Sequence, residues 1–174
     1  MKLVRLKINK KFRSLFDGFQ INFREDEPNE NWEKFHPFCF AGLNGSGKSN
    51  VLEALANIFY HLECCTLNEN YSEYLKNDFD NRKSEVDAYE LEYYIIARDS
   101  NKDSYEDYNR ILIKKEEGNI PQISITKENV LGLKYQPVAN SIRSFLPELV
   151  IGYSSGENEI LSLPFVKSRL LQFD

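Results

Sequence analysis

The sequence has little of several features that mark specialised classes of protein. Only three of its 174 residues are cysteines, Cys39, Cys64 and Cys65, and their spacing fits neither a metal-ligand motif nor a disulfide framework. No apolar run approaches the roughly 18 residues that a membrane-spanning helix needs. The first residues alternate charge and apolarity, unlike the apolar block of a secretion signal. We therefore expect a cytoplasmic chain with no membrane association, whose cysteines serve in packing.

An excess of basic residues is also absent. The chain has 22 Lys and Arg against 27 Asp and Glu, a formal net charge of -5. This balance argues against a surface that binds nucleic acid over its whole extent. Lys7, Lys10, Lys11 and Arg13 form a local basic cluster, which is typical of a solvated strand edge, and a local contact with nucleic acid is the alternative. The length suits one domain, so we expect residues 1–174 to form a single lobe.

One stretch carries a complete phosphate-binding pattern. Residues 42–49 fit GxxxxGKS, and Gly45 lies inside the loop where the backbone must turn tightly. We expect successive backbone N–H groups to surround phosphates, Lys48 to reach the β- and γ-phosphates, and the Ser49 hydroxyl to bind Mg²⁺. The predicted site for ATP and Mg²⁺ comprises Asn44, Gly45, Ser46, Gly47, Lys48, Ser49 and Asn50.

The flanks of this loop predict a strand before it and a helix after it. Residues 38–41 are aromatic and apolar, as in a buried parallel strand. The residues after the loop are expected to form a helix with one apolar face, which comprises Val51, Leu52, Leu55, Ile58, Phe59 and Leu62. The alternative interpretation is a glycine-rich surface turn that happens to carry a lysine.

The rest of the chain is mostly strand-like. Residues 2–8 alternate, and a turn at Asp17-Gly18 leads to a return strand over residues 19–23, which predicts a hairpin. Further predictions are strands over residues 89–98, 110–115, 120–126 and 149–152 and a helix over residues 141–145.

The stretch Phe12-Arg13-Ser14, the strand after Gly18 and the loop GLNGSGKSN together resemble the N-terminal half of ABC-type ATPase heads. Among these heads, they are similar to the SMC and RecF-like ATPases that act on DNA. The resemblance implies an α/β fold, the N-terminal lobe of a P-loop NTPase, with a mixed sheet, an antiparallel strand group and a P-loop helix. It also implies that Arg13 approaches the bound nucleotide, although the residue by itself equally fits a solvent-facing turn.

Two resemblances lie near the end of the chain. Residues 153–157 resemble the ABC signature, which implies that Ser154 and Gly156 meet the γ-phosphate held by a second head in a homodimer. The alternative is an ordinary helix cap. Residues 151–165 resemble a segment of restriction-system-associated AAA family ATPases, which are linked with defence against foreign DNA. That similarity implies DNA or restriction-system proteins as partners.

A catalytic base is not recognisable. An ATP-hydrolysing head needs an apolar strand that ends in Asp-Glu, and the sequence contains no convincing one. The catalytic residues are therefore unknown, and we expect a fragment of a longer ATPase that does not hydrolyse ATP efficiently alone. A non-catalytic nucleotide-binding interaction module is the main alternative. A P-loop kinase or GTPase is disfavoured, because a hairpin precedes the loop and no guanine-binding motif follows it.

Overall fold

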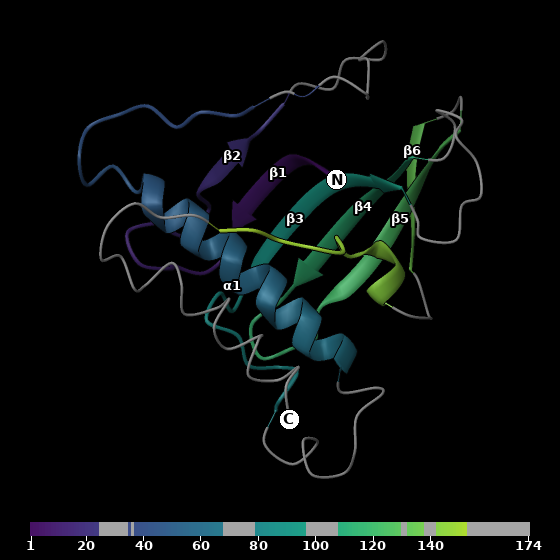
Figure 1. Cartoon of the computed structure of the whole chain (residues 1–174). Helices are drawn as coiled ribbons and strands as arrows, with labels where there is room; N and C mark the ends of the chain where they lie inside the picture. Colours follow the sequence, from purple (N-terminus) through teal and green to yellow (C-terminus); the bar gives the residue numbers. More distant parts are fainter. Residues whose placement is uncertain are drawn as a thin grey trace.

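The computed structural model describes residues 1–24, 35, 37–67, 79–96, 108–129, 132–137 and 142–152. Within these residues the chain forms one sheet with one α-helix on it (Figure 1). The elements are β1 (Lys2–Ile8), β2 (Gln20–Asn22), α1 (Lys48–Leu67), β3 (Tyr89–Ile96), β4 (Tyr108–Lys115), β5 (Gln122–Asn129), β6 (Gly132–Pro137) and the short 3-10 helix η2 (Ile142–Phe145).

The sheet has the strand order β2-β1-β3-β4-β5-β6, and each of its pairings is antiparallel. The predicted hairpin is confirmed, since Arg5 pairs with Asn22 and Lys7 with Gln20. The predicted α/β class and antiparallel strand group are also confirmed. The prediction of a mixed sheet is wrong for the described part of the chain, where even β1 and β3, which are separated along the chain by β2 and α1, pair as antiparallel neighbours.

The segment before the glycine-rich loop is not a strand. Residues 37–43 have no strand hydrogen bonds, and Phe38 is 47% exposed. Phe38 and Phe40 instead contact Phe23 just beyond β2, with ring centroids 5.2 and 6.4 Å away. A buried parallel strand needs neighbours on both sides. After α1 the chain returns as β3, which pairs with β1 and leaves residues 37–43 without a neighbouring strand in the described part.

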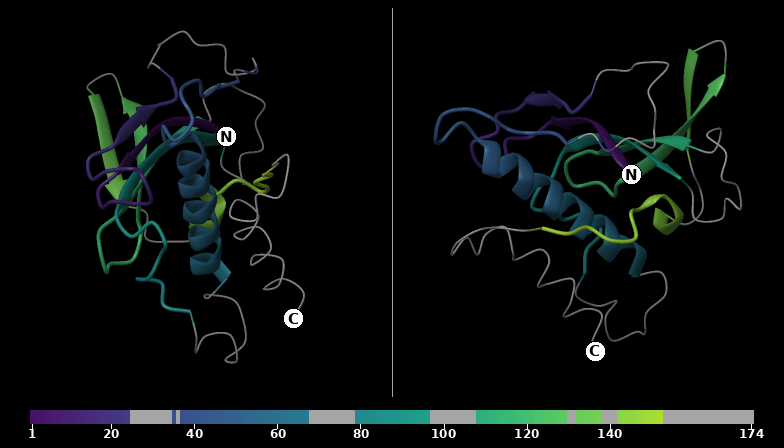
Figure 2. Two further views of the ribbon diagram at one scale, coloured as in Figure 1. Left: turned by 90° about the vertical axis from the view of Figure 1, so that its left-hand side faces the viewer. Right: turned by 45° about the horizontal axis from the view of Figure 1, so that its top comes forward.

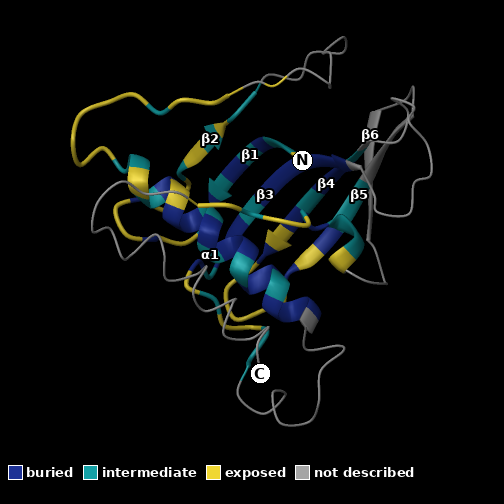
Figure 3. Ribbon diagram, in the orientation of Figure 1, coloured by how far each residue is buried: buried dark blue, intermediate teal, exposed yellow. Residues whose placement is uncertain are grey.

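The core lies between α1 and the face of the sheet that α1 covers (Figures 2 and 3). Side chains that alternate along the central strands share this face because their residues pair in register. The buried residues of the face are Leu6, Ile8, Tyr89, Leu91, Tyr93, Ile95, Ile111, Ile113 and Ile123. This two-layer packing fixes the position of α1, and therefore of the loop that leads into it.

Helix α1 buries apolar side chains at helical spacing, which explains why this segment is helical on the sheet. Val51, Ala54, Ile58 and Leu62 follow the i, i+3, i+4 pattern and are all at most 2% exposed. The prediction that Leu52 shares this face is wrong, because Leu52 is 47% exposed. One residue after Val51 corresponds to a rotation of about 100° around the helix, which turns Leu52 away from the sheet.

Residues 142–152 pass along α1 after the sheet is complete (Figure 1). The predicted helix over 141–145 is present as η2, and the Tyr93 hydroxyl donates a hydrogen bond of 2.7 Å to the carbonyl oxygen of Phe145. The strand predicted over residues 149–152 is not formed, since these residues pair with none of the described strands. Leu149 and Ile151 are 72% and 79% exposed.

The cysteines differ in environment. Cys64 and Cys65 are buried on α1 as predicted, whereas the packing role predicted for Cys39 is wrong because its residue is exposed in the non-strand segment. None of the helices in the described ranges is long and apolar enough to cross a membrane.

Candidate functional site

The glycine-rich loop turns directly into the N-terminus of α1. Gly45 and Gly47 have φ angles of 83° and 89°, a left-handed region that glycine occupies without the cost a side chain imposes. The Ser46 N–H donates to the Leu43 carbonyl (3.2 Å), which closes the turn, and the Val51 N–H donates to the Gly47 carbonyl (3.1 Å), which begins the helix. The first N–H groups of a helix have no partner within it, so this end of α1 favours an anion.

Lys48, the first residue of α1, folds back over the loop. Its Nζ donates to the carbonyl oxygens of Gly42 (2.8 Å) and Leu43 (2.7 Å) and to the Ser46 Oγ (3.2 Å). All three acceptors belong to the loop itself, and each of these loop residues is exposed. The arrangement therefore holds a positive charge at the mouth of the loop, where exchange of its acceptors for phosphate oxygens requires no change in the core.

The turn after β1 packs directly behind the loop. Phe12 and Leu15 form an isolated antiparallel bridge, and both are buried. Asn50 Nδ2 donates a hydrogen bond to the Ser14 Oγ from the first turn of α1. A Cβ added at Gly47 would lie 3.2 Å from the Ser14 Oγ and 3.3 Å from Leu15 Cδ2, so any larger residue here would push these side chains back by a few tenths of an ångström. The structure thus brings two of the three stretches on which the resemblance rests, residues 12–14 and the glycine-rich loop, into contact.

Arg13 reaches α1 from the same turn. Its backbone has a φ of 52°, and its Nε and Nη2 donate to Glu53 Oε1 at 3.1 and 2.9 Å. This hydrogen bond, together with the charge of Glu53, raises the pKa of the Arg13 guanidinium. Arg13 is therefore held beside the first turns of the helix that follows the loop, with 53% of its side chain exposed.

Sequence reasoning missed Glu53 and Ser14. Glu53 is 4% exposed, and it lies on α1 between the buried residues Val51 and Ala54. A carboxylate within an apolar helical face is a signal that a cationic partner is present, because a buried charge is costly unless it is paired. The identity of that partner could not be deduced, since Arg13 lies 40 residues earlier in the chain.

The remaining predicted site residues divide into two groups. Asn44 is exposed in the loop, and Ser49 is exposed in the first turn of α1, beside Lys48. Ser154 and Gly156 lie outside the described residues. Across the described ranges, no group of three or more His, Cys, Asp or Glu side chains is arranged to hold a metal ion. Ser49 is therefore the one predicted Mg²⁺ ligand that the described part of the chain places at the loop.

Comparison of this chain with known proteins finds no matching family model, no similar curated protein and no similar solved structure.

Proposed function

We propose that residues 42–49 bind the phosphates of ATP together with Mg²⁺, and that the chain is the N-terminal lobe of a P-loop NTPase of the ABC type. The observation that carries the proposal is the Lys48 ammonium drawn over a glycine-rich loop at the N-terminus of α1. Backbone N–H groups of residues 44–50 would donate to the phosphates, and the Ser49 hydroxyl would ligate Mg²⁺. Lys48 would exchange loop carbonyls for the β- and γ-phosphate oxygens.

The turn behind the loop supports this assignment. Ser14 and Arg13 both contact the first two turns of α1, through Asn50 and Glu53. A bound phosphate gains from a rigid loop, because the donors are then already in place. We propose that Ser14 positions the loop and that Arg13 exchanges Glu53 for a phosphate oxygen when the nucleotide is bound.

The wider role follows from the resemblances. We propose that a longer form of this cytoplasmic protein hydrolyses ATP, and that two such heads pair with Ser154 and Gly156 of one head facing the phosphate bound by the other. We propose further that this ATPase acts on DNA or with restriction-system proteins. These proposals rest only on the resemblance of short stretches of the sequence.

Nucleotide-dependent stabilisation tests the proposed binding. ATP·Mg²⁺ at about 100 times its dissociation constant should raise the free energy of unfolding by roughly 2.7 kcal/mol. Lys48→Ala should remove most of this gain, whereas Lys114→Ala, which removes an exposed lysine on β4, should retain it. Equal gains for the wild type and Lys48→Ala would refute the proposal. A larger gain with GTP than with ATP would favour the GTPase alternative.

A phosphate-release assay separates an enzyme from a binding module. The isolated 174 residues should release phosphate from ATP well below the ordinary enzyme range of about 1 s⁻¹, because no catalytic base is recognised. Turnover in that range that is abolished by Lys48→Ala would show that a base is present. A longer form that also fails to turn over would favour the non-catalytic module.

A further inference from the structure

A second polar site lies farther along α1 than the glycine-rich loop. A cavity of about 520 Å³ opens there between the C-terminal half of α1, the turn after β1 and the segment before β3. Its lining includes Lys11, Tyr60, His61, Phe79, Lys83 and Ser84. His61 lies thirteen residues beyond Lys48, which corresponds to about 20 Å along the helix, so this cavity is separate from the loop.

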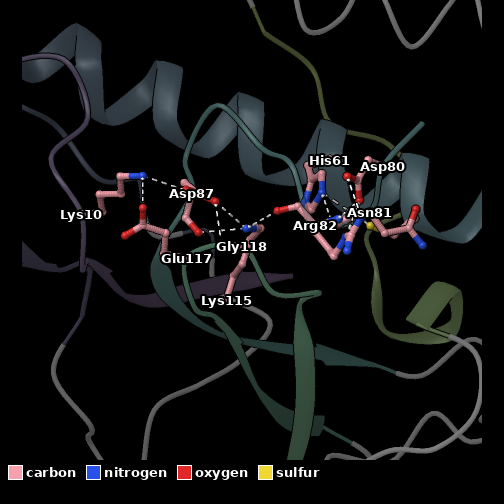
Figure 4. Close-up of polar contacts among 10 residues, drawn as sticks. Lys10, His61, Asp80, Asn81, Arg82, Asp87, Lys115, Glu117 and Gly118 are labelled. Atoms are coloured by element: carbon pink, nitrogen blue, oxygen red, sulfur yellow. Dashed lines mark hydrogen bonds and ion pairs between the residues drawn. The ribbon is translucent and has the colours of Figure 1, made fainter. Parts of the chain in front are cut away.

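Beside the cavity, the ammonium groups of Lys10 and Lys115 both pair with the Asp87 carboxylate. Asp87 accepts hydrogen bonds from Lys10 Nζ (2.9 Å) and from Lys115 Nζ (2.9 Å), as Figure 4 shows. Burial alone would raise the pKa of Asp87, but these hydrogen bonds outweigh it and lower the pKa to about 2. Lys10 is bonded to Glu117 as well (2.7 Å). The side chains of Lys10, Asp87, Lys115 and Glu117 are therefore paired with one another on one side of the cavity.

Two lining lysines have unpaired side chains. The ammonium groups of Lys11 and Lys83 are exposed and make no ion pair or hydrogen bond within the described part of the chain. Among the described lining residues, Glu85 is the one carboxylate besides Asp87. Two lysines against one carboxylate leave an excess of positive charge among the described lining residues. An anion entering the cavity would meet two ammonium groups that need not give up another partner.

His61 supplies an unpaired acceptor in the same lining. It is 3% exposed, and its Nε2 lies 3.0 Å from the Asn81 carbonyl oxygen, which only accepts, so Nε2 carries the hydrogen (Figure 4). Burial and the nearby charge of Lys115 lower the pKa of His61 to about 4, so the ring is neutral at pH 7 and Nδ1 is an acceptor. Nδ1 and the Ser84 Oγ are both buried and have no hydrogen-bond partner.

We propose that this cavity binds a small phosphate monoester that also carries a hydroxyl or amino group. The phosphate lies between Lys11 and Lys83, and the hydroxyl or amino group donates to His61 Nδ1 after a small shift of the side chains that cover it. The volume lies within the range of small-molecule sites, about 300 to 1,000 Å³, and the rings of Tyr60 and Phe79 supply apolar wall. This site is distinct from the proposed ATP site at Lys48.

Calorimetric titration tests the proposal in the full 174-residue chain carrying Lys48→Ala, so that the result is independent of the loop. The probes are AMP, glucose 6-phosphate, inorganic phosphate, adenosine and glucose. At least one phosphate monoester should bind with one-to-one stoichiometry and roughly tenfold more tightly than inorganic phosphate, while adenosine and glucose should not bind. A ¹⁵N spectrum should show the His61 Nδ1 resonance moving on binding.

Two lysine pairs provide matched variants. Lys11→Ala with Lys83→Ala should weaken the monoester at least about tenfold, because two charge-assisted contacts are lost. Lys7→Ala with Lys114→Ala removes the same charge from the strands on the face of the sheet away from α1 and should leave the affinity unchanged. Ser84→Ala should weaken binding mildly without unfolding the chain.

Three results would overturn the proposal. These are no saturable binding of any monoester up to about 10 mM, equal weakening by the two lysine pairs, or monoesters that bind no more tightly than inorganic phosphate. The second result would indicate attraction to net charge alone, and the third would indicate an adventitious ion only.

Discussion

Two lysine ammonium groups, Lys48 at the N-terminus of α1 and Lys115 on β4, each donate three hydrogen bonds, yet their environments are opposite. Lys48 donates to two carbonyls and a hydroxyl of an exposed loop. Lys115 on β4 is 0% exposed and donates to the carbonyls of Arg82 and Asp87 and to Asp87 Oδ1, each at 2.9 Å (Figure 4). The number of hydrogen bonds therefore does not separate a functional lysine from a structural one.

The two lysines differ in the groups that would lose a hydrogen-bond donor if the lysine side chain were removed. Removing the Lys115 side chain would leave the carbonyls of Arg82 and Asp87 without this donor and the Asp87 carboxylate with Lys10 as its remaining ammonium partner, which costs free energy of unfolding. Removing the Lys48 side chain would return exposed carbonyls to water at little cost. We therefore assign stability to Lys115 and ligand binding to Lys48, and the following predictions test that separation.

The largest expected effect is on stability at Lys115. Lys115→Met should lower the free energy of unfolding by about 2 to 4 kcal/mol, because it removes the fully buried member of an ion pair whose ammonium also donates to two carbonyls. Urea denaturation measures the loss. Lys114→Met on the same strand removes an exposed lysine paired with Glu116 and should change stability by about 0.5 kcal/mol or less. Equal losses in the two variants would contradict a structural role for Lys115.

The next effect is a pH dependence from His61. The folded-state pKa of about 4 lies below the ordinary 6.5, so folding favours neutral His61, and this stability is present above pH 6.5 and lost as the pH falls toward 4. The groups facing His61 are Lys115, Asp87, the Asn81 carbonyl and the Cys65 Sγ. Between pH 7.5 and 4.5 the wild type should lose about 2 to 3 kcal/mol more than His61→Leu. The same pH dependence in both proteins would contradict the assigned environment.

A smaller effect is expected at Gly47. Gly47→Ala should cost about 1 to 2 kcal/mol of stability, because a Cβ there adopts a left-handed φ and approaches Ser14 and Leu15 closely. It should also weaken ATP binding, since the loop must shift. Gly118→Ala has a similar φ of 68° but open space around the added Cβ, so it should leave ATP binding unchanged. If both variants retain wild-type affinity, the loop is not the phosphate site.

The smallest effect is expected at Arg13, and it sharpens the role of the turn behind the loop. Arg13→Ala should lower the free energy of unfolding by about 1 kcal/mol, because the guanidinium is half exposed but its removal leaves the buried Glu53 carboxylate without this cation. It should weaken ATP binding about tenfold if Arg13 exchanges Glu53 for a phosphate oxygen. Arg82→Ala removes an exposed arginine paired with Asp80 and provides the control. If Arg13→Ala binds ATP as tightly as the wild type, Arg13 is only a solvent-facing turn residue.

Much of the sheet could be predicted from the sequence because its strands alternate. Residues 2–8 and 110–115 show the period of two that a half-covered sheet imposes, and the structure has β1 and β4 there. Residues 38–41 and 149–152 are continuous apolar runs instead. Such runs become strands only where neighbouring strands pair with them, and no single segment carries that information. The sequence also gave no indication of β6.

The candidate site could be predicted from the sequence only where consecutive residues form a known pattern. The order of residues 42–49 identifies the loop and Lys48, because the chemistry is contained in consecutive residues. Ser14 and Glu53 act through contacts 36 and 40 residues apart, which only the fold reveals. Lys115 had a signal that sequence reasoning missed, since it alternates in phase with the buried Ile111 and Ile113.

A single titration compares the glycine-rich loop at Lys48 with the surroundings of Lys115 directly. In ¹H–¹⁵N spectra of the 174-residue chain with increasing ATP·Mg²⁺, the amide signals of Gly45, Gly47, Lys48 and Ser49 should move together and saturate. The amide signals of Arg82, Asp87 and Lys115 should stay within the spread of the remaining core. Lys48→Ala should abolish the loop shifts at the same ATP concentration. Loop amides that do not move, or that move equally in Lys48→Ala, would contradict the account.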